Sequence, residues 1–281
     1  MNEQFENSPL QSLKLYEPFL FLKDGLEMIL SREYRFFLVV PLLINLVVMG
    51  VGGYLAFVGL HSFLESYLNL LPEFLSFLSY VVYFLLIASL GFAFCYFFST
   101  VATIIASPFY GILSEKVELN LAHTRGNDDG VMDIVKDVPR ILARELRKQA
   151  FFLPRALLCL IVTFVPLLNV ISPVLWFILT AYMATLQYSD YAFDNHKLPF
   201  ARMRKTLGSQ KPVTLLLGAV VALALTVPLL NLLVAPVAVC AGTRYYLRLR
   251  DLDPTLRRDW EGYSAKEDAA GTAVTAAHKD N

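Results

Sequence analysis

The sequence predicts an all-α integral membrane protein with two long transmembrane helices and two proline-broken helical hairpins that penetrate the bilayer only partly. Three observations support this: an apolar composition, four runs without a charged residue, and an uneven distribution of lysine and arginine. Of 281 residues, 56% are apolar and 17% are charged, against about 25% charged in a typical soluble domain. The 24 basic and 24 acidic residues cancel, so the basic excess expected of a nucleic-acid-binding protein is missing.

The four charge-free runs are the candidate membrane segments. A helix needs about 20 apolar residues to cross a hydrocarbon core of about 30 Å, and every run exceeds that length. The first two runs predict transmembrane helices at about 36–60 and 77–105. The runs cover residues 36–64, 74–114, 156–189 and 212–243.

Lysine and arginine indicate the orientation. No basic residue lies between Phe36 and Glu115, whereas 116–155 carries eight and 190–211 carries five. Loops rich in lysine and arginine stay on the cytoplasmic side of a membrane. Both basic segments and both termini are therefore expected in the cytoplasm.

The last two runs conflict with this orientation if each crosses the membrane once, because 190–211 would then lie outside. Two crossings per run would need about 40 residues and a turn, more than the 34 and 32 available. The remaining arrangement is a hairpin that enters from the cytoplasm and turns back, with arms of about 10–16 residues. We expect such hairpins at about 154–189 and 212–247.

A repeated motif marks the centre of both predicted hairpins. Both read Pro-Leu-Leu-Asn, at 166–169 and 228–231, and a second proline follows four or five residues after the asparagine. Paired prolines break a helix, and a broken backbone at membrane depth needs protein or a wet cavity around it. Asn169 and Asn231 are therefore candidate pore or hairpin-tip residues. The alternative is two kinked helices packed against neighbours.

The remaining segments are polar. Residues 116–153 predict a cytoplasmic amphipathic helical segment in which Arg140, Arg144, Arg147 and Lys148 share one face. This face would either gather anions near a cytoplasmic opening or contact lipid phosphates. Residues 1–250 then form a single membrane domain, and the polar residues 251–281 are expected to be a disordered tail.

The sequence lacks the motifs of an enzyme. There is no GxSxG, phosphate loop, HExxH or dinucleotide fingerprint, and the cysteines and histidines lack metal-ligand spacing. Asp190, Asp194 and His196 would either relay protons near a transport path or supply turn bonds and a helix cap. We expect a protein that is not an enzyme and uses no metal or cofactor.

One segment resembles a known family. Residues 187–200 read QYSDYAFDNHKLPF, similar to the QYxDYPxDNHKxPF signature of the CysZ sulfate transporters. Further matches follow in order along the chain, and the resemblance covers roughly 25–249. The etoposide-induced membrane proteins are more distant relatives of the same group. The other matching stretches are FFST at 97–100, ASPFYG at 106–111, KDVPRI at 136–141, PLLN at 228–231 and PVAVC at 236–240.

The resemblance implies sulfate uptake across a bacterial inner membrane to supply cysteine biosynthesis. It also implies two long transmembrane helices and two partly penetrating hairpins, in agreement with the arrangement predicted from run length and charge. The expected partners are sulfate, membrane lipid and further copies of the chain. A non-transporting membrane scaffold or assembly factor is the alternative function. Without an ATP-binding motif, transport would be passive or ion-coupled.

The resemblance also implies a site. Relatives carry a Gly-Leu-Arg(-Arg) turn just before the first span, proposed to bind sulfate, and 33–36 is the matching stretch. Arg35 is kept, whereas Glu33 replaces the glycine and Phe36 replaces the second arginine. A glutamate at this position would repel an anion, and Arg32 would partly substitute for the missing charge.

The implied substrate-binding residues are therefore Arg35 and Arg32. Glu115 and Glu118 are expected to act in gating or helix packing, or to pair with Lys116 or with the face that carries Arg140. Helix N-termini at the broken hairpins would add N–H donors for an anion.

Overall fold

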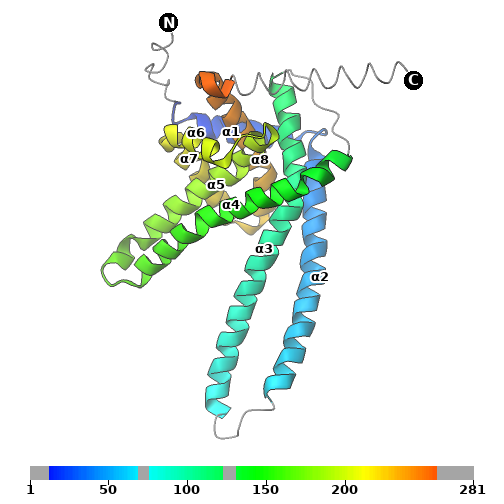
Figure 1. Cartoon of the computed structure of the whole chain (residues 1–281), viewed down its shortest axis with the longest axis vertical. Coiled ribbons are helices and arrows are strands. Elements are labelled where there is room, and N and C mark those ends of the chain that lie inside the picture. The colour runs from blue at the N-terminus through cyan, green and yellow to red at the C-terminus, as the bar shows by residue number, and fades with distance from the viewer. Residues whose placement is uncertain (1–12, 69–75, 123–130, 258–281) are drawn as a thin grey trace, which may run out of the picture. The chain divides into compact units, whose positions relative to one another are not determined.

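The computed structural model describes residues 13–68, 76–122 and 131–257, and every regular element in these ranges is a helix (Figure 1). The expectation of an all-α protein is confirmed. The chain divides into two compact units. One comprises Met1–Leu38 and Pro108–Asn281, and the other comprises Val39–Ser107.

The unit Val39–Ser107 contains most of α2 (Arg35–Leu68) and the N-terminal part of α3 (Ser76–Ala122). The full helices have 34 and 47 residues, about 51 and 70 Å at 1.5 Å per residue. Large apolar side chains such as Phe57, Phe84 and Phe92 are exposed. A helix that is apolar all round belongs in a large core or in a membrane.

In the other unit, α5 lies at the centre of the packing. It contacts α4, α7 and α8, and α1 packs against α8 (Figure 1). The core between these helices includes Phe193, Leu207 and Tyr245. The helices are α1 (Glu17–Leu30), α4 (Val131–Phe164), α5 (Ser172–Asn195), α6 (Phe200–Ser209), α7 (Lys211–Leu225) and α8 (Pro228–Leu252).

Two glycines allow α7 and α8 to reach the main chain of α5. A Cβ on Gly218 of α7 would lie 1.7 Å from the carbonyl oxygen of Ala181, and one on Gly242 of α8 would lie 2.6 Å from that of Tyr188. Real side chains never come this close, so both positions require glycine. These contacts fix the helices around α5 that position the site.

The first hairpin consists of α4, α5 and a connection that holds the short 3₁₀ helix η2 (Leu168–Ile171). Asn169 is exposed in η2, within the connection between α4 and α5. Leu167 just before it has a φ of 71°, a backbone conformation that costs a leucine roughly 1–3 kcal/mol. Pro173 lies in the first turn of α5, where the lack of an N–H on proline costs no helical hydrogen bond.

The arms of this hairpin are longer than the sequence predicts. The amphipathic segment and the first arm form one helix, α4, because Pro154 is accommodated inside it rather than at a boundary. Proline at 154 removes the bond to the carbonyl of Ala150, a position that is exposed and therefore tolerates the loss. The stretch Leu168–Asn195 is long and apolar enough to cross a membrane.

The second hairpin uses the same motif differently. Pro228 begins α8, whereas the second proline, Pro236, lies inside that helix. Asn231 falls in the first turn of α8, but its side chain lies outside the described part of the chain. The bent pair α6 and α7, with an angle of 102° between them, is by length and composition either a broken span or a re-entrant loop.

The ordered chain continues past the predicted boundary at 250. Helix α8 ends at Leu252, and residues 254–257 form another helical turn. Leu256 is fully buried in the core around α5, which holds this turn in place. Residues 258–281, most of the predicted tail, lie outside the described residues.

Candidate functional site

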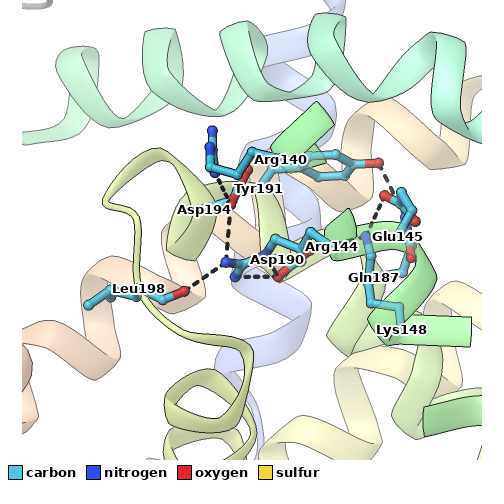
Figure 2. A network of polar contacts seen from close by, with 9 residues as sticks. All are labelled: Arg140, Arg144, Glu145, Lys148, Gln187, Asp190, Tyr191, Asp194 and Leu198. Carbon is cyan, nitrogen blue, oxygen red and sulfur yellow. Dashed lines mark hydrogen bonds and ion pairs between the residues drawn. The ribbon is translucent and has the colours of Figure 1, made fainter. Parts of the chain in front are cut away.

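Six charged side chains meet where the base of α4 packs against α5 (Figure 2). The basic residues of α4 and the acidic residues of α5 are both spaced four apart, so each set lies on one helix face. Glu145 of α4 completes a group of three positive and three negative charges. We call this group the ion network; its members are Arg140, Arg144, Glu145, Lys148, Asp190 and Asp194.

Arg144 is the centre of the ion network. Its Nε and Nη2 donate to Oδ1 of Asp190 at 2.8 and 2.6 Å, and its Nη1 donates to the carbonyl of Leu198 at 2.7 Å. The same Nη1 lies 3.0 Å from Oδ1 of Asp194. Figure 2 shows the guanidinium group between these three acceptors.

Lys148 and Arg140 extend the ion network to either side. The Nζ of Lys148 lies 2.5 Å from Glu145 and 3.1 Å from Oδ2 of Asp190, and it also lies 5.5 Å from the ring centre of Tyr191. Arg140 pairs with Asp194. Every acidic group of the network therefore has a basic partner.

Burial explains why this pairing matters. Lys148 is 1% exposed and Asp190 is 2% exposed, and a charge removed from water destabilises the fold unless an opposite charge compensates it. The cationic face predicted on 116–153 is thus mostly internal. Three of its four basic residues contact carboxylates, and Arg147 is exposed.

The same contacts revise the interpretation of Asp190 and Asp194. Their carboxylates form ion pairs with basic residues of α4, which neither of the two interpretations from the sequence includes. A single sequence shows acidic and basic helix faces separately but does not show that the two faces meet. The matched spacing of four on 140–148 and 190–194 is the signal that would have found the network.

His196 follows α5 and contacts the last turns of α3. Its Nε2 lies 2.8 and 2.9 Å from the two carboxylate oxygens of Glu118, and its ring stacks on Tyr246 at 5.3 Å. His196 is therefore one partner of Glu118. Glu115, on the same helix, is half-buried. A second bond, from Asn195 to the carbonyl of Gly111 at 3.1 Å, also joins α5 to α3.

The turn that precedes α2 is held against α3 by Tyr34, which is 2% exposed. Asn120 donates to the hydroxyl of Tyr34 at 3.1 Å. Lys116 donates to the carbonyl of Glu33 at 3.1 Å and lies 5.1 Å from the Tyr34 ring centre. Sequence reasoning missed Tyr34, Lys116 and Asn120 as supports of this turn, because their contacts join residues more than 80 positions apart.

Arg32 and Arg35 are exposed on this turn. The Nε of Arg35 donates to the carbonyl of Leu30 at 3.1 Å, and its two terminal amino groups form no hydrogen bond within the described residues. Neither arginine forms an ion pair within the described ranges 13–68, 76–122 and 131–257. The turn thus presents positive charge on a braced backbone, although the predicted tip residue Asn169 makes no contact with it.

Comparison with known proteins decides the family. The model of the family described as Sulfate transporter CysZ/Etoposide-induced protein 2.4 matches residues 21–236. The sulfate transporter CysZ of Vibrio parahaemolyticus is 44% identical over 224 residues, which are 79% of this chain and 91% of the relative. This chain belongs to the CysZ/etoposide-induced family.

Further CysZ relatives match over similar lengths. The sulfate transporter CysZ of Vibrio atlanticus is 43% identical over 224 residues, or 79% of this chain and 89% of the relative. That of Salmonella typhimurium is 41% identical over 228 residues, or 81% and 90%. The resemblance seen in the sequence is confirmed, and the chain is an all-helical membrane protein. The ion network and the turn with Arg32 and Arg35 both lie inside the matched region.

Proposed function

We propose that this protein is a sulfate permease of a bacterial inner membrane that supplies sulfate for cysteine biosynthesis. The observation that carries the proposal is identity of 41–44% to proteins named sulfate transporter CysZ over about four fifths of the chain. These relatives are named as transporters, and we accordingly propose a transporter rather than an enzyme.

In the proposed arrangement, α2 and α3 cross the bilayer at about 36–60 and 77–105. The hairpins at about 154–189 and 212–247 enter from the cytoplasm, where both termini, the segment 116–153 and the tail 251–281 lie. Exposed apolar side chains at the first hairpin tip support this placement, among them Phe164, Leu167 and Val170. A tip of this composition favours hydrocarbon over water. The stretch Leu168–Asn195 is long enough to cross the membrane completely, so a full crossing by α5 is the competing arrangement.

Arg35 and Arg32 are the proposed sulfate contacts. Sulfate is a doubly charged acceptor that binds best to charge-assisted N–H donors, and Arg35 presents two terminal amino groups on a turn held by Tyr34. The ammonium group of Lys116 beside the carbonyl of Glu33 adds positive charge to the same turn. Because this turn precedes α2, we place sulfate at the cytoplasmic end of the first span.

The other predicted residues take secondary roles. The contact of Glu118 with His196 favours helix packing over gating, and Glu115 remains a gating or packing candidate. Asn169 and Asn231 are proposed to line a wet path at the hairpin tips, where amide groups would replace part of the hydration of the anion. Transport is passive or ion-coupled. The exposed apolar sides of α4 and α5 favour a homo-oligomer, in which neighbouring copies or lipid cover them.

Uptake of radiolabelled sulfate by liposomes tests the function. Liposomes with the protein are expected to fill faster than empty liposomes, and equal rates would refute the proposal. Arg35→Ala should lower sulfate uptake about tenfold through the loss of a charged hydrogen-bond donor. Arg147→Ala is the matched control, since it removes the same charge from an exposed position of α4.

A second candidate function is a non-transporting membrane scaffold or assembly factor. Glu33 and Phe36 favour it, because they replace the glycine and second arginine of the sulfate-binding turn. A deletion strain distinguishes the two functions. Poor growth on low sulfate as the sole sulfur source supports the permease, and normal growth supports the scaffold.

A further inference from the structure

Two arginines outside the ion network meet one aromatic cluster where α4, α5 and α6 join. The guanidinium carbon of Arg155 lies 3.5 Å from the ring centre of Phe151. That of Arg204, from α6, lies 4.7 Å from the same ring and 5.5 Å from Phe200. The ring centre of Tyr182, from α5, lies 6.2 Å from Phe151. Three helices thus bring two positive charges to one place.

No carboxylate of the described chain neutralises this pair. Arg155 donates one hydrogen bond, to the carbonyl of Phe151 at 2.6 Å. The Nε of Arg204 is buried and has no hydrogen-bond partner among the described residues. Contact with aromatic faces supplies part of the missing stabilisation, but a buried N–H donor without an acceptor still costs free energy. The contrast is with Arg144, whose guanidinium meets two carboxylates and a carbonyl.

The spacing suits a single anion. Both guanidinium groups lie against the Phe151 ring, so their carbons are at most about 8 Å apart. One tetrahedral oxyanion would bridge them at the edge of that ring, through N–H···O bonds of about 2.9 Å to each group. Arginine recognises such groups through paired donors. The ring centre of Tyr182 lies 6.2 Å from that of Phe151, and its hydroxyl is a further donor.

We propose that Arg155, Arg204 and Tyr182 form a second anion site, which binds one sulfate or phosphate group at the base of the first hairpin. This site is separate from the turn that carries Arg32 and Arg35. The phosphate group would belong to an anionic phospholipid whose chains lie along the exposed apolar surface of α4, at Leu157 and Leu158. If the ligand is free sulfate, it would be the transported ion. Only this possibility rests on the proposed function, whereas lipid binding does not.

The test compares two double variants of the full-length protein. Arg155→Gln/Arg204→Gln removes the proposed donors, and Arg147→Gln/Lys205→Gln removes the same number of charges from exposed positions of the same two helices. Sulfate binding is measured in detergent free of phospholipid. Lipid binding is measured by native mass spectrometry in detergent after addition of phosphatidylglycerol, with phosphatidylcholine as the neutral comparison.

If the ligand is sulfate, the site variant is expected to lose one of two sulfate sites and to keep the one at Arg32 and Arg35. If it is the lipid, phosphatidylglycerol should bind about 10- to 100-fold more weakly than to the wild type, as expected for the loss of two charge-assisted contacts. The control should keep both sulfate sites and a lipid affinity within about threefold of the wild type. Loss of one sulfate site identifies the transported ion as the ligand, and loss of phosphatidylglycerol binding identifies the lipid. If neither changes more than in the control, the site does not exist.

Two further measurements keep the outcome interpretable. Arg155→Lys/Arg204→Lys keeps both charges but loses the paired donors, so it should fall between wild type and the glutamine variant even if the latter fails to fold. Liposome uptake by the wild type separates the two proposals. An absence of uptake would refute the permease. The second anion site would then be tested by phosphatidylglycerol binding alone.

Discussion

The ion network and the turn before α2 use arginine in opposite ways. Arg144 is buried among two carboxylates and a carbonyl, whereas Arg35 is exposed and bonds to one carbonyl. Both lie in segments that flank the charge-free runs of the sequence. The difference shows that positive charge near a membrane is not by itself an anion site. An arginine whose donors are all used holds helices together, and one with unused donors remains available for a ligand.

The largest expected effect is loss of a carboxylate from the ion network. Asp190→Ala leaves Arg144 and Lys148 without their shared partner in a buried place, and breaking a buried pair this way costs about 3–5 kcal/mol. Thermal unfolding in detergent should show a large fall in the midpoint. Asp251→Ala, at an exposed carboxylate, is the control and should change stability by about 1 kcal/mol or less. Similar midpoints for the two variants would contradict the structural role of the network.

The same substitution in both regions sharpens the comparison. Arg144→Lys keeps the charge but loses the planar fork that reaches Asp190 and Leu198, so we expect a loss of about 1–3 kcal/mol. Arg35→Lys should change stability by about 0.5 kcal/mol or less, because exposed positions contribute little. Both values come from thermal unfolding of the purified variants. Equal destabilisation would mean that Arg35 is also a structural residue.

Restoring glycine to the turn should strengthen sulfate binding. Glu33→Gly removes a negative charge next to Arg32 and Arg35, and we expect an affinity about 3- to 10-fold higher. The support from Lys116 should persist, since Lys116 bonds to the main-chain carbonyl of residue 33. Equilibrium binding of radiolabelled sulfate measures the change. Glu27→Gln, an exposed acidic position on α1, controls for charge alone and should leave the affinity unchanged.

Salt distinguishes the two regions without any mutation. Raising sodium chloride from 0.05 to 0.5 M shortens the screening length to a few ångström, which weakens interactions of exposed charges far more than those of buried ones. Sulfate binding at Arg35 should therefore fall several-fold, whereas the unfolding midpoint should change little. A salt-sensitive midpoint would indicate that water reaches the ion network.

The smallest effect concerns Asp253, a partly exposed carboxylate at the end of α8. Burial alone would raise the pKa of this group, but hydrogen bonds from Thr255 and Leu256 and the charge of Arg202 lower it overall. Since the folded pKa lies below the unfolded value of about 3.9, the stabilisation is complete above that value and disappears as the pH falls through the folded pKa. The unfolding midpoint of Asp253→Asn should therefore depend less on pH below about 4 than that of the wild type.

Much of the fold was predictable because membrane helices follow from composition. Charge-free length identified helical regions, and Pro166 and Asn169 lie in the connection between α4 and α5. The repeat misleads at the second hairpin, where Pro236 lies within α8. Pro154 likewise does not end a helix. Helix α4 continues through this proline while it packs against α5. Tertiary contacts decide such cases, and one sequence does not contain them.

The candidate site was less predictable than the fold. Arg35 and Arg32 were found through their position relative to a family motif, and their exposure agrees with that role. The partners of Arg144 and Glu118 were not predictable, because they lie 46 and 78 residues away along the chain. The charge pattern shows which residues share one face of a helix. Only the fold shows which face of another helix packs against it.

Leu167 links the shape of the first hairpin to its surroundings. This leucine is 89% exposed and adopts a backbone conformation that glycine would take without strain. In the proposed arrangement its side chain enters hydrocarbon, which favours a leucine by about 1.5–3 kcal/mol, similar in size to the strain. In this arrangement, the turn keeps the observed backbone conformation at Leu167 only when lipid surrounds it. Extraction into a small, short-chain detergent should relax it, so the tip reports on the thickness and quality of the surrounding bilayer.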